Sequence, residues 1–549
     1  MRAGAAALAL CAAASCVSVA PPPPRQSESY ADFLIARVAN MRGDHRAASD
    51  RYSSALAGGA ARDASVIQGA LIASLAIGDA DRARALARQG AQQEPVAYAH
   101  IVRGAEALSD GRWRQAREQF ERVDGDASER LTARMLLTWA LTGEGQPGDS
   151  DVDLGRLLNV RPYGALFAYQ QALSLDYGGR AEEALAAYAA AADGGLWMPP
   201  AVERHADLLA RLGHRDEAIT LLTAGPQQTP NIALEAALAR YQATQQVAQA
   251  PLTPARGAAI GLNGLAIVFL QERDTTRALV TLTLALMLDP ELDAARINYA
   301  DAQMDLDHYD EAEAALGQIS LDSPYGQSAR AMEAWLLIDR GREEEALAMA
   351  RASAESGAPR ALRALGDIYR RLERYEEADA VYTRLLETSP DDWRLLFARG
   401  AAREQLSRHA EAEADLQRAL EVSPDQPDVL NYLGYMWVDR GERLEEALAM
   451  IMRAVELRPL SGAIIDSLGW AYFRMGQYEQ ALIFLERAVE LEPADPTLND
   501  HLGDVYWRLD RRTEARFQWR RALTLEPADA GAIEAKLEDG LPPTRSATR

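Results

Sequence analysis

The stretch that decides the fold is residues 466–507, which read DSLGWAYFRMGQYEQALIFLERAVELEPADPTLNDHLGDVYW. Within it a small residue, Gly469, is followed by a second small residue, Ala481, and then by Pro493. The same pattern starts again at Gly503, 34 positions after Gly469. Antiparallel helices approach closely only where the facing side chains are small, so each unit is predicted to be a helix pair. The proline removes a backbone donor and ends the second helix.

This unit recurs with a nearly constant period. The first-helix glycines are spaced by 34, 34, 35 and 34 positions, and a period of 34 residues is the signature of tetratricopeptide helix pairs. Because one pair cannot bury its own apolar face, we predict an all-α superhelical solenoid of about a dozen helix pairs. Its framework residues are Gly366, Gly400, Gly434, Gly469 and Gly503 in first helices, Ala447, Ala481 and Ala515 in second helices, and Pro459, Pro493 and Pro527 after them.

The same phase continues toward the N-terminus, with alanine in place of most glycines. The register is broken by a glycine-containing stretch at residues 142–153 and fails again between residues 225 and 257, where Pro251, Pro254 and Gly257 follow an apparent helix. We expect an irregular solenoid over residues 30–250, a linker over 251–257, a regular solenoid over 258–527, a capping helix over 528–540 and a disordered tail over 541–549. The upstream marks are Ala36 with Ala48, Gly104 with Ala116, Ala172 with Ala184, Ala206 with Ala218, Ala266 with Ala278, Ala300 with Ala312, and Ala334 with Ala346.

The N-terminus holds both cysteines of the chain, Cys11 and Cys16, in an apolar, alanine-rich run. This run is too short to span a bilayer, so residues 1–15 are predicted to be a signal peptide. Ala13-Ala14-Ser15-Cys16 resembles the bacterial lipoprotein processing site, which implies lipidation of Cys16. A proline-rich tether over residues 16–29 would then connect the lipid to the fold.

The resemblance to lipoproteins also implies a location. Val17 follows the cysteine in place of the aspartate that retains such proteins at the inner membrane. We therefore expect an outer-membrane lipoprotein that faces the periplasm. The alternatives are a soluble periplasmic protein cut after Ala20 and a cytosolic protein with an alanine-rich start.

Composition and motifs argue against several function classes. The net charge of −23 disfavours nucleic acid as a partner, since phosphate binding needs a positive surface. The seven histidines are scattered without metal-ligand spacing. Residues 143–148 match G-x-G-x-x-G, but a helix, not a strand, leads into them. We expect no enzyme activity, no metal and no cofactor.

Helical spacing predicts which residues line a groove. In the first helix of each pair, the positions three before, one after and four after the small residue are expected to face the concave side. Aromatic rings there suit peptide recognition because they bury a large area at low entropic cost. The alternative is that the rings pack between adjacent first helices. The candidate groove residues are Asn431, Tyr435, Asp466, Trp470, Phe473, Asp500, Asp504 and Trp507.

Two further groove positions are basic. Arg363 and Arg370 could receive a carboxylate or an acidic segment, since guanidinium offers a bidentate fork. The alternative is a solvated face on which the arginines pair with Glu373 and Glu376.

Residues 262–527 resemble a family of tetratricopeptide proteins common in alphaproteobacteria. The resemblance implies outer-membrane lipoprotein adaptors that bind a periplasmic carboxyl-terminal processing protease and present its substrates, including peptidoglycan-cleaving enzymes. We expect a non-catalytic adaptor that binds proteins or peptides; the alternative is a scaffold for pilus, secretion or cell-wall machinery without a protease partner. The segments that carry the resemblance are Asp322-Ser323-Pro324-Tyr325, Asp392-Trp393-Arg394-Leu395-Leu396, Leu430-Asn431-Tyr432-Leu433-Gly434-Tyr435, Asp466-Ser467-Leu468-Gly469-Trp470 and His501-Leu502-Gly503-Asp504-Val505-Tyr506-Trp507.

Overall fold

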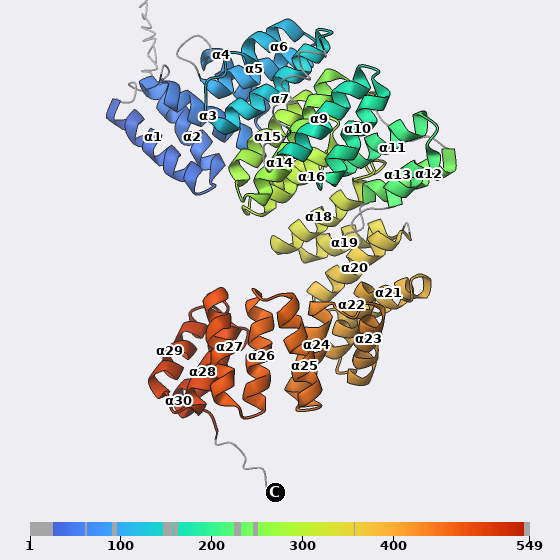
Figure 1. Cartoon of the computed structure of the whole chain (residues 1–549). Coiled ribbons are helices and arrows are strands. Elements are labelled where there is room, and N and C mark those ends of the chain that lie inside the picture. The colour runs from blue at the N-terminus through green and yellow to red at the C-terminus, as the bar shows by residue number, and fades with distance from the viewer. Residues whose placement is uncertain are drawn as a thin grey trace, which may run out of the picture. The chain divides into compact units, whose positions relative to one another are not determined.

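The computed structural model describes residues 26–60, 63–90, 96–146, 158, 163–223, 232–244, 251–355 and 357–542. Across these ranges every regular element is a helix, as Figure 1 shows. The chain divides into two compact units, unit 1 over residues 1–340 and unit 2 over residues 341–549. Within each unit the helices follow one another as antiparallel pairs, which confirms the prediction of an all-α solenoid.

The pair α26 (Gly462–Arg474) and α27 (Tyr478–Leu491) shows why the small residues recur. A Cβ atom on Gly469 would lie 2.6 Å from Leu485 Cγ, so only glycine permits this approach. Ala481 is fully buried beside it, and α27 ends two residues before Pro493. Every alanine of the predicted phase, upstream and downstream, is likewise fully buried. The predicted framework alanines thus lie in the buried interior of the helix pairs.

Helix ends follow from local sequence. In α28 (Pro496–Arg508), Pro496 occupies the first turn, where its missing N–H costs nothing. Asp495 precedes it as the N-cap, and its carboxylate accepts hydrogen bonds from the backbone N–H groups of Thr497 at 2.7 Å and Leu498 at 3.1 Å. Such caps fix where each first helix begins and hence which residues it presents.

Unit 1 contains seven helix pairs among the described residues. They are α1 (Gln26–Met41) with α2 (His45–Ala55), α3 (Ala64–Ala76) with α4 (Ala80–Gly90), α5 (Ala97–Ser109) with α6 (Trp113–Phe120), α9 (Gly164–Tyr177) with α10 (Ala181–Asp193), α11 (Pro199–Arg211) with α12 (Arg215–Thr223), α14 (Pro254–Gln271) with α15 (Thr275–Leu288), and α16 (Asp293–Met304) with α17 (Tyr309–Leu316). A short π-helix, η1 (Leu56–Ala60), follows α2, and α7 (Ala127–Gly143), α13 (Ile232–Thr244) and α18 (Gly326–Asp339) complete the unit.

Unit 2 contains five pairs and two further helices. The pairs are α20 (Pro359–Arg371) with α21 (Tyr375–Thr388), α22 (Trp393–Gln405) with α23 (His409–Val422), α24 (Pro427–Arg440) with α25 (Leu444–Leu457), α26 with α27, and α28 with α29 (Arg512–Leu523). The helix α19 (Glu343–Ala354) precedes them, and α30 (Ala530–Asp539) follows them as the predicted capping helix.

In unit 1, α14 and α15 pack on first helices far away in the sequence. They contact α3, α5, α7 and α9, so the side expected to be concave is filled by the chain itself. The approach is close: a Cβ atom on Gly257 would lie 2.1 Å from the ring of Trp139, and one on Gly261 would lie 2.5 Å from Gln170. The indole Nε1 of Trp139 donates to Gln170 Oε1 at 2.7 Å. One continuous core results, with buried residues from Ala36 to Leu336.

This packing corrects the predicted domain boundary. The break in register near residue 251 does not separate two segments, because α14 and the pairs after it belong to unit 1, and the division falls between residues 340 and 341. Residues 254–257 of the predicted linker form the first turn of α14, which Thr253 caps. The predicted tether is also too long, since α1 begins at Gln26.

The other predictions about the two termini have mixed outcomes. Cys16 and the predicted signal peptide lie outside the described residues. At the other end Leu541 packs on the C-terminal core, and Arg508 Nη1 donates to the carbonyl oxygen of Pro542 at 2.7 Å. The first two residues of the predicted tail are therefore bound to unit 2, and residues 543–549 lie outside the described part. No described helix is both long and apolar enough to cross a bilayer.

Candidate protein-binding face

The candidate site is the inner face of unit 2, formed by the first helices α20, α22, α24, α26 and α28 at the three predicted positions of each. In this unit each helix packs substantially only on helices one or two places away along the chain. No distant helix pair among the described residues fills the inner face as α14 and α15 fill unit 1. Within the described part of unit 2, the inner face is therefore open to a partner protein.

The structure places the predicted groove residues at different depths. Asn431, Tyr435, Trp470, Phe473, Asp500 and Trp507 are half-buried, so part of each side chain reaches the surface. Asp466 and Asp504 are buried and bound to other side chains of the chain. The helical spacing that predicted these two carboxylates gave the direction of the backbone but not their intramolecular partners. Their direct availability to a ligand is the part of the prediction that needs correction.

Asp466 holds a buried histidine. Its Oδ2 lies 2.9 Å from His501 Nδ1, and both side chains are almost completely buried. The ring of Trp470 stacks on His501 with centroids 4.0 Å apart, and the ring of Phe473 also stacks on Trp470 at 4.7 Å. Trp470 thus packs between α26 and α28, as the alternative interpretation of the aromatic rings proposed. The stack fixes the position of the indole and leaves part of it exposed.

The pKa of the His501 imidazole is raised although the ring is buried. Burial by itself would lower the pKa of His501, but the charge of Asp466 and the hydrogen bond with it raise that pKa above its ordinary value. Asp504 and Asp500 act in the same direction. A protonated ring stacked on indole also gains cation–π attraction. The charged pair therefore ties α26 to α28 beneath the inner face.

A pH dependence of stability follows for unit 2. Because the pKa of His501 is raised in the folded state, its contribution is fully present below the unfolded value of about 6.5 and is lost as the pH rises through the folded pKa. We expect His501→Gln, which can still donate to Asp466 but does not titrate, to lack this loss. Urea midpoints of both proteins at pH 5.5 to 9 measure the difference. A wild-type midpoint that does not fall relative to the variant with rising pH would contradict the pairing.

The end of the inner face is occupied by the C-terminal helix. Lys536 of α30 donates to Asp500 Oδ2 at 2.7 Å and to Asp504 Oδ2 at 2.9 Å. Trp519 Nε1 donates to the other oxygen of Asp504 at 2.9 Å. Burial by itself would lower the pKa of Lys536, but the charges of the two aspartates and the hydrogen bonds to them raise it above its ordinary value. Lys536 is therefore charged at neutral pH.

Trp507 belongs to the same C-terminal packing. Its ring lies 5.3 Å from that of Trp519, and the guanidinium of Arg512 stands 3.8 Å over it. A Cβ atom on Gly540 would lie 1.8 Å from the Trp507 ring, so the chain after α30 passes directly against this indole. Trp507 is mainly a structural residue of the capped end.

The middle of the inner face is more open and polar. Tyr435 keeps part of its ring at the surface, and burial together with the charges of Asp466 and Asp439 raises the pKa of its hydroxyl to about 12. Asn431 of α24 and Trp470 of α26 each carry a buried polar atom here. Asn431 Oδ1 and Trp470 Nε1 make no hydrogen bond within the described part of the chain. Buried polar groups are normally satisfied, so these two atoms depart from the usual pattern, but neither reaches solvent and neither is open to a partner in this conformation.

The basic positions lie at the other end of the inner face. Arg363 Nε is 3.9 Å from Asp367 Oδ2, beyond hydrogen-bond distance, and Asp367 accepts a hydrogen bond from the Tyr382 hydroxyl at 2.7 Å. Arg370 is exposed in the last turn of α20. Arg363 is thus half-buried with one weak ion pair, and Arg370 is exposed with a hydrogen bond to the Tyr382 side chain.

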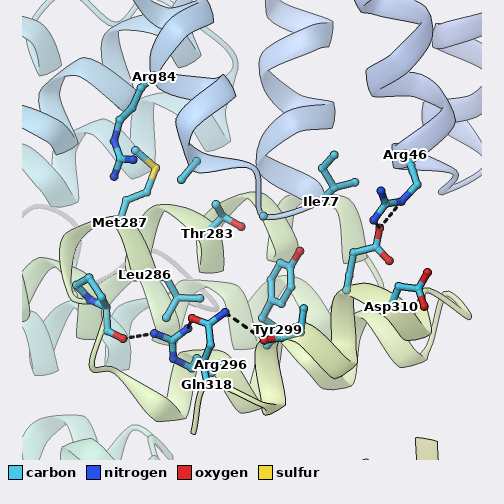
Figure 2. A pocket seen from close by; sticks show the side chains of 16 residues that line it. Arg46, Ile77, Arg84, Thr283, Leu286, Met287, Arg296, Tyr299, Asp310 and Gln318 are labelled. Atoms are coloured by element: carbon cyan, nitrogen blue, oxygen red, sulfur yellow. Dashed lines mark hydrogen bonds and ion pairs between the residues drawn. The ribbon is translucent and has the colours of Figure 1, made fainter. Parts of the chain in front are cut away.

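A second hollow, shown in Figure 2, lies in unit 1 where α2–α4 face α15–α17. Its volume is about 350 Å³. The seam is closed by Thr283, whose hydroxyl donates to the Leu75 carbonyl at 2.7 Å, and by an ion pair of 2.6 Å between Arg46 and Glu311. The other arginines are also engaged, Arg84 with Asp81 and Arg296 with Gln318. The charges that line this cavity are matched by partners within unit 1.

No described group of three His, Cys, Asp or Glu side chains is arranged to hold a metal ion. The chemistry that the inner face offers is noncovalent: aromatic stacking, hydrogen bonding and guanidinium contact.

Models of repeat families match the second half of the chain. Those described as tetratricopeptide repeat match residues 269–336, 331–392 and 365–431, and one described as TPR repeat matches residues 469–510. These segments are tetratricopeptide repeats. Repeats of this kind generally mediate protein–protein interactions, and they are typically non-catalytic scaffolds.

Individual relatives resemble short parts of the tetratricopeptide array. A TPR repeat-containing protein of Pseudomonas aeruginosa is 44% identical over 55 residues, which cover 10% of this chain and 9% of the relative. A solved tetratricopeptide repeat protein of Parabacteroides merdae is 19% identical with a TM-score of 0.37, covering 44% of this chain and 96% of its own. A thermophilic TPR protein of Thermus thermophilus is 23% identical with a TM-score of 0.30, covering 33% of this chain and 97% of its own.

Two side-chain pairings in the tetratricopeptide array were not predicted from the sequence. The pairing of Lys536 with Asp500 and Asp504 was missed, although a signal existed, since Lys536 is the only lysine of the chain. The pairing of His501 with Asp466 was also missed, because a lone histidine on a packed helix gives no indication of its partner in the neighbouring repeat.

Proposed function

We propose that the chain is a non-catalytic scaffold that binds protein segments on the inner face of unit 2. The observation that carries the proposal is the contrast between the units. In unit 1 the first helices α3, α5, α7 and α9 are covered by α14 and α15, whereas in unit 2 no described helix more than two places away along the chain packs substantially on the first helices. The inner face of unit 2 is therefore the surface that we assign to a partner protein segment.

The binding segment is assigned to the centre of the inner face. Trp470 and Tyr435 offer rigid aromatic surface there, and Asn431 is a half-buried polar residue of the same face. Arg370 at one end could hold a carboxylate of the same partner. The capped end, where Lys536 already occupies Asp500 and Asp504, is not part of the assigned site.

The finer proposal concerns location and partner. We infer that the protein is anchored by a lipid on Cys16 to the outer membrane, faces the periplasm, and brings a carboxyl-terminal processing protease to its substrates. The support is the resemblance of residues 262–527 to adaptors of this type, together with the cysteine at the end of the apolar N-terminal run. A scaffold for envelope assembly without a protease remains the competing function.

Photo-crosslinking tests the assigned face. With p-benzoylphenylalanine in place of Tyr435, we expect a covalent adduct in the native envelope that mass spectrometry identifies as a processing protease or its substrate. The matched control carries the same group in place of Phe517, an exposed aromatic residue on the second helix α29. It should give no such adduct.

The outcomes separate the hypotheses. Adducts with pilus, secretion or cell-wall components from position 435 would favour the assembly scaffold. Equal adducts from both positions, or none from position 435, would show that the inner face is not the binding site.

A further inference from the structure

The first helix of unit 1 carries several large apolar side chains that are exposed to solvent. Five large apolar side chains of α1 are exposed, with 64% of Tyr30 and 83% of Met41 accessible to solvent. At 100° per residue the five fall within about 140° of the helix circumference. Scattered apolar residues are common on protein surfaces, but a contiguous set on one face marks an interaction site. The set is Tyr30, Leu34, Ile35, Val38 and Met41, here called the α1 outer face.

The orientation of the α1 outer face is fixed by packing on the opposite side of the helix. Ala36 is fully buried, and the Ser29 hydroxyl donates to the Ala55 carbonyl at 2.8 Å. The ring of Phe33 lies 6.3 Å from that of Tyr52 in α2. Because these contacts hold α1 against its neighbour, rotation of the helix cannot hide the exposed residues. α1 lies at the edge of the unit in Figure 1, beside α2.

The position of α1 in the sequence indicates what covers this face. Gln26, its first residue, follows Cys16 by ten positions, and ten residues extend at most about 35 Å. A lipid on Cys16 would thus hold α1 within that distance of the bilayer. Apolar side chains with a tyrosine among them suit the boundary between head groups and acyl chains.

A second copy of the chain fits the α1 outer face less well. A stable protein interface of standard size uses roughly 20–30 residues on each side, and this face offers five large apolar side chains. A lipid surface needs no complementary shape, and one helix face suffices for it. Arg37 lies at the rim of the face by helical position, and its guanidinium lies 5.8 Å from the Phe33 ring.

We propose that the α1 outer face is a membrane-contact surface that lies in the head-group boundary of the leaflet carrying the anchor. The proposal rests on the lipid anchor of the proposed function. The anchor would limit the distance of unit 1 from the bilayer, and the α1 outer face would determine which side of the unit meets it.

Spin labelling of the full lipidated chain tests the proposal. Cys11 lies in the predicted signal peptide and the lipid would occupy Cys16, so an introduced cysteine is the sole free thiol. One variant carries the label through Ile35→Cys on the α1 outer face. The matched control carries it through Ser54→Cys, an exposed position on α2 of the same helix pair. Both proteins are reconstituted into vesicles of phosphatidylethanolamine and phosphatidylglycerol.

We expect collisions with dissolved oxygen, relative to a water-soluble nickel complex, to be at least threefold more frequent for the label at position 35 than at position 54. Equal ratios at the two positions would overturn the proposal. Dipolar broadening between labels at position 35 would also overturn it, since a second copy would then cover the face.

A separate measurement tests whether Cys16 carries the lipid anchor. Mass spectrometry of the N-terminal peptide shows whether Cys16 carries a fatty acid. If it does not, the anchored location in the proposed function fails. Unanchored protein in which Cys11 and Cys16 are replaced by alanine, labelled at position 35 and mixed with the same vesicles, then decides the contact: lipid exposure at position 35 supports it, and water exposure contradicts it.

Discussion

Replacing Trp139 by alanine is expected to lower the free energy of unfolding of unit 1 by about 3–5 kcal/mol, the range for removing a large aromatic side chain from a core. Trp139 is fully buried in α7, and its ring fills the space that the missing side chain of Gly257 leaves on α14. The substitution leaves a cavity and removes the donor to Gln170. Hydrogen exchange of peptides from α7, α9 and α14 in increasing urea measures the loss.

Trp197 provides the matched control, because it is a tryptophan of the same unit with 41% of its surface exposed. Trp197→Ala should change the stability by less than about 1 kcal/mol. If the two variants were equally stable, α14 would not be seated against α7, and the boundary near residue 251 would have to be restored.

Replacing Lys536 by methionine is expected to destabilise the C-terminal end of unit 2 by about 3 kcal/mol. The value is at the low end of the range for breaking a buried ion pair, because a fifth of the Lys536 side chain remains exposed. The cost arises from leaving Asp500 and Asp504 without a cation, the latter almost completely buried. Hydrogen exchange of α28, α29 and α30 measures it.

Two further proteins separate lost charge pairing from lost packing. Asp500→Asn and Asp504→Asn added to Lys536→Met should recover most of the stability, because no buried charge then remains unpaired. Arg487→Met removes the cation of the exposed pair with Glu490 and should change the stability by less than about 0.5 kcal/mol. A methionine variant as stable as the Arg487 control would show that Lys536 does not hold the cap.

The repeat framework was predictable because its cause is local. Ala300 and Ala312 were placed by a phase carried back from Gly366, and both are fully buried where one helix crosses the next. The close approach of two helices requires small residues at fixed positions whatever the rest of the chain does. The capping helix α30 was predictable for a similar reason, since an array must end on a polar surface.

The domain boundary was wrong because it depends on contacts that no local pattern encodes. Pro251 and Pro254 interrupt the repeat phase, yet Pro254 simply starts α14. A signal was present in the composition of the helices. α3 and α14 are apolar nearly all round, and a helix of that kind is buried on every side. Gly257, Gly261 and Gly264 further mark one side of α14 for close approach.

The candidate site was predictable in direction but not in partners. Helical spacing brought Tyr435 and Trp470 to the inner face, where the structure places them half-buried. The same rule brought Asp504 there, but Lys536 and Trp519 already bind its two oxygens. A positional rule states where a backbone points, whereas the fate of a carboxylate depends on cations that arrive from elsewhere in the chain.

The packing of α14 and α15 on helices far upstream also determines the order in which unit 1 can fold. The hydrogen bond from Thr283 to Leu75 joins residues 208 positions apart. At a synthesis rate of roughly 5–20 residues per second, α3 therefore waits about 10–40 s before its partner in α15 exists. Each helix of unit 2 meets its neighbours within one repeat, so this unit can grow by addition. The two units therefore differ during translation: part of the apolar surface of unit 1 stays uncovered until α14 and α15 have been made, whereas each helix of unit 2 meets its neighbours as it is added.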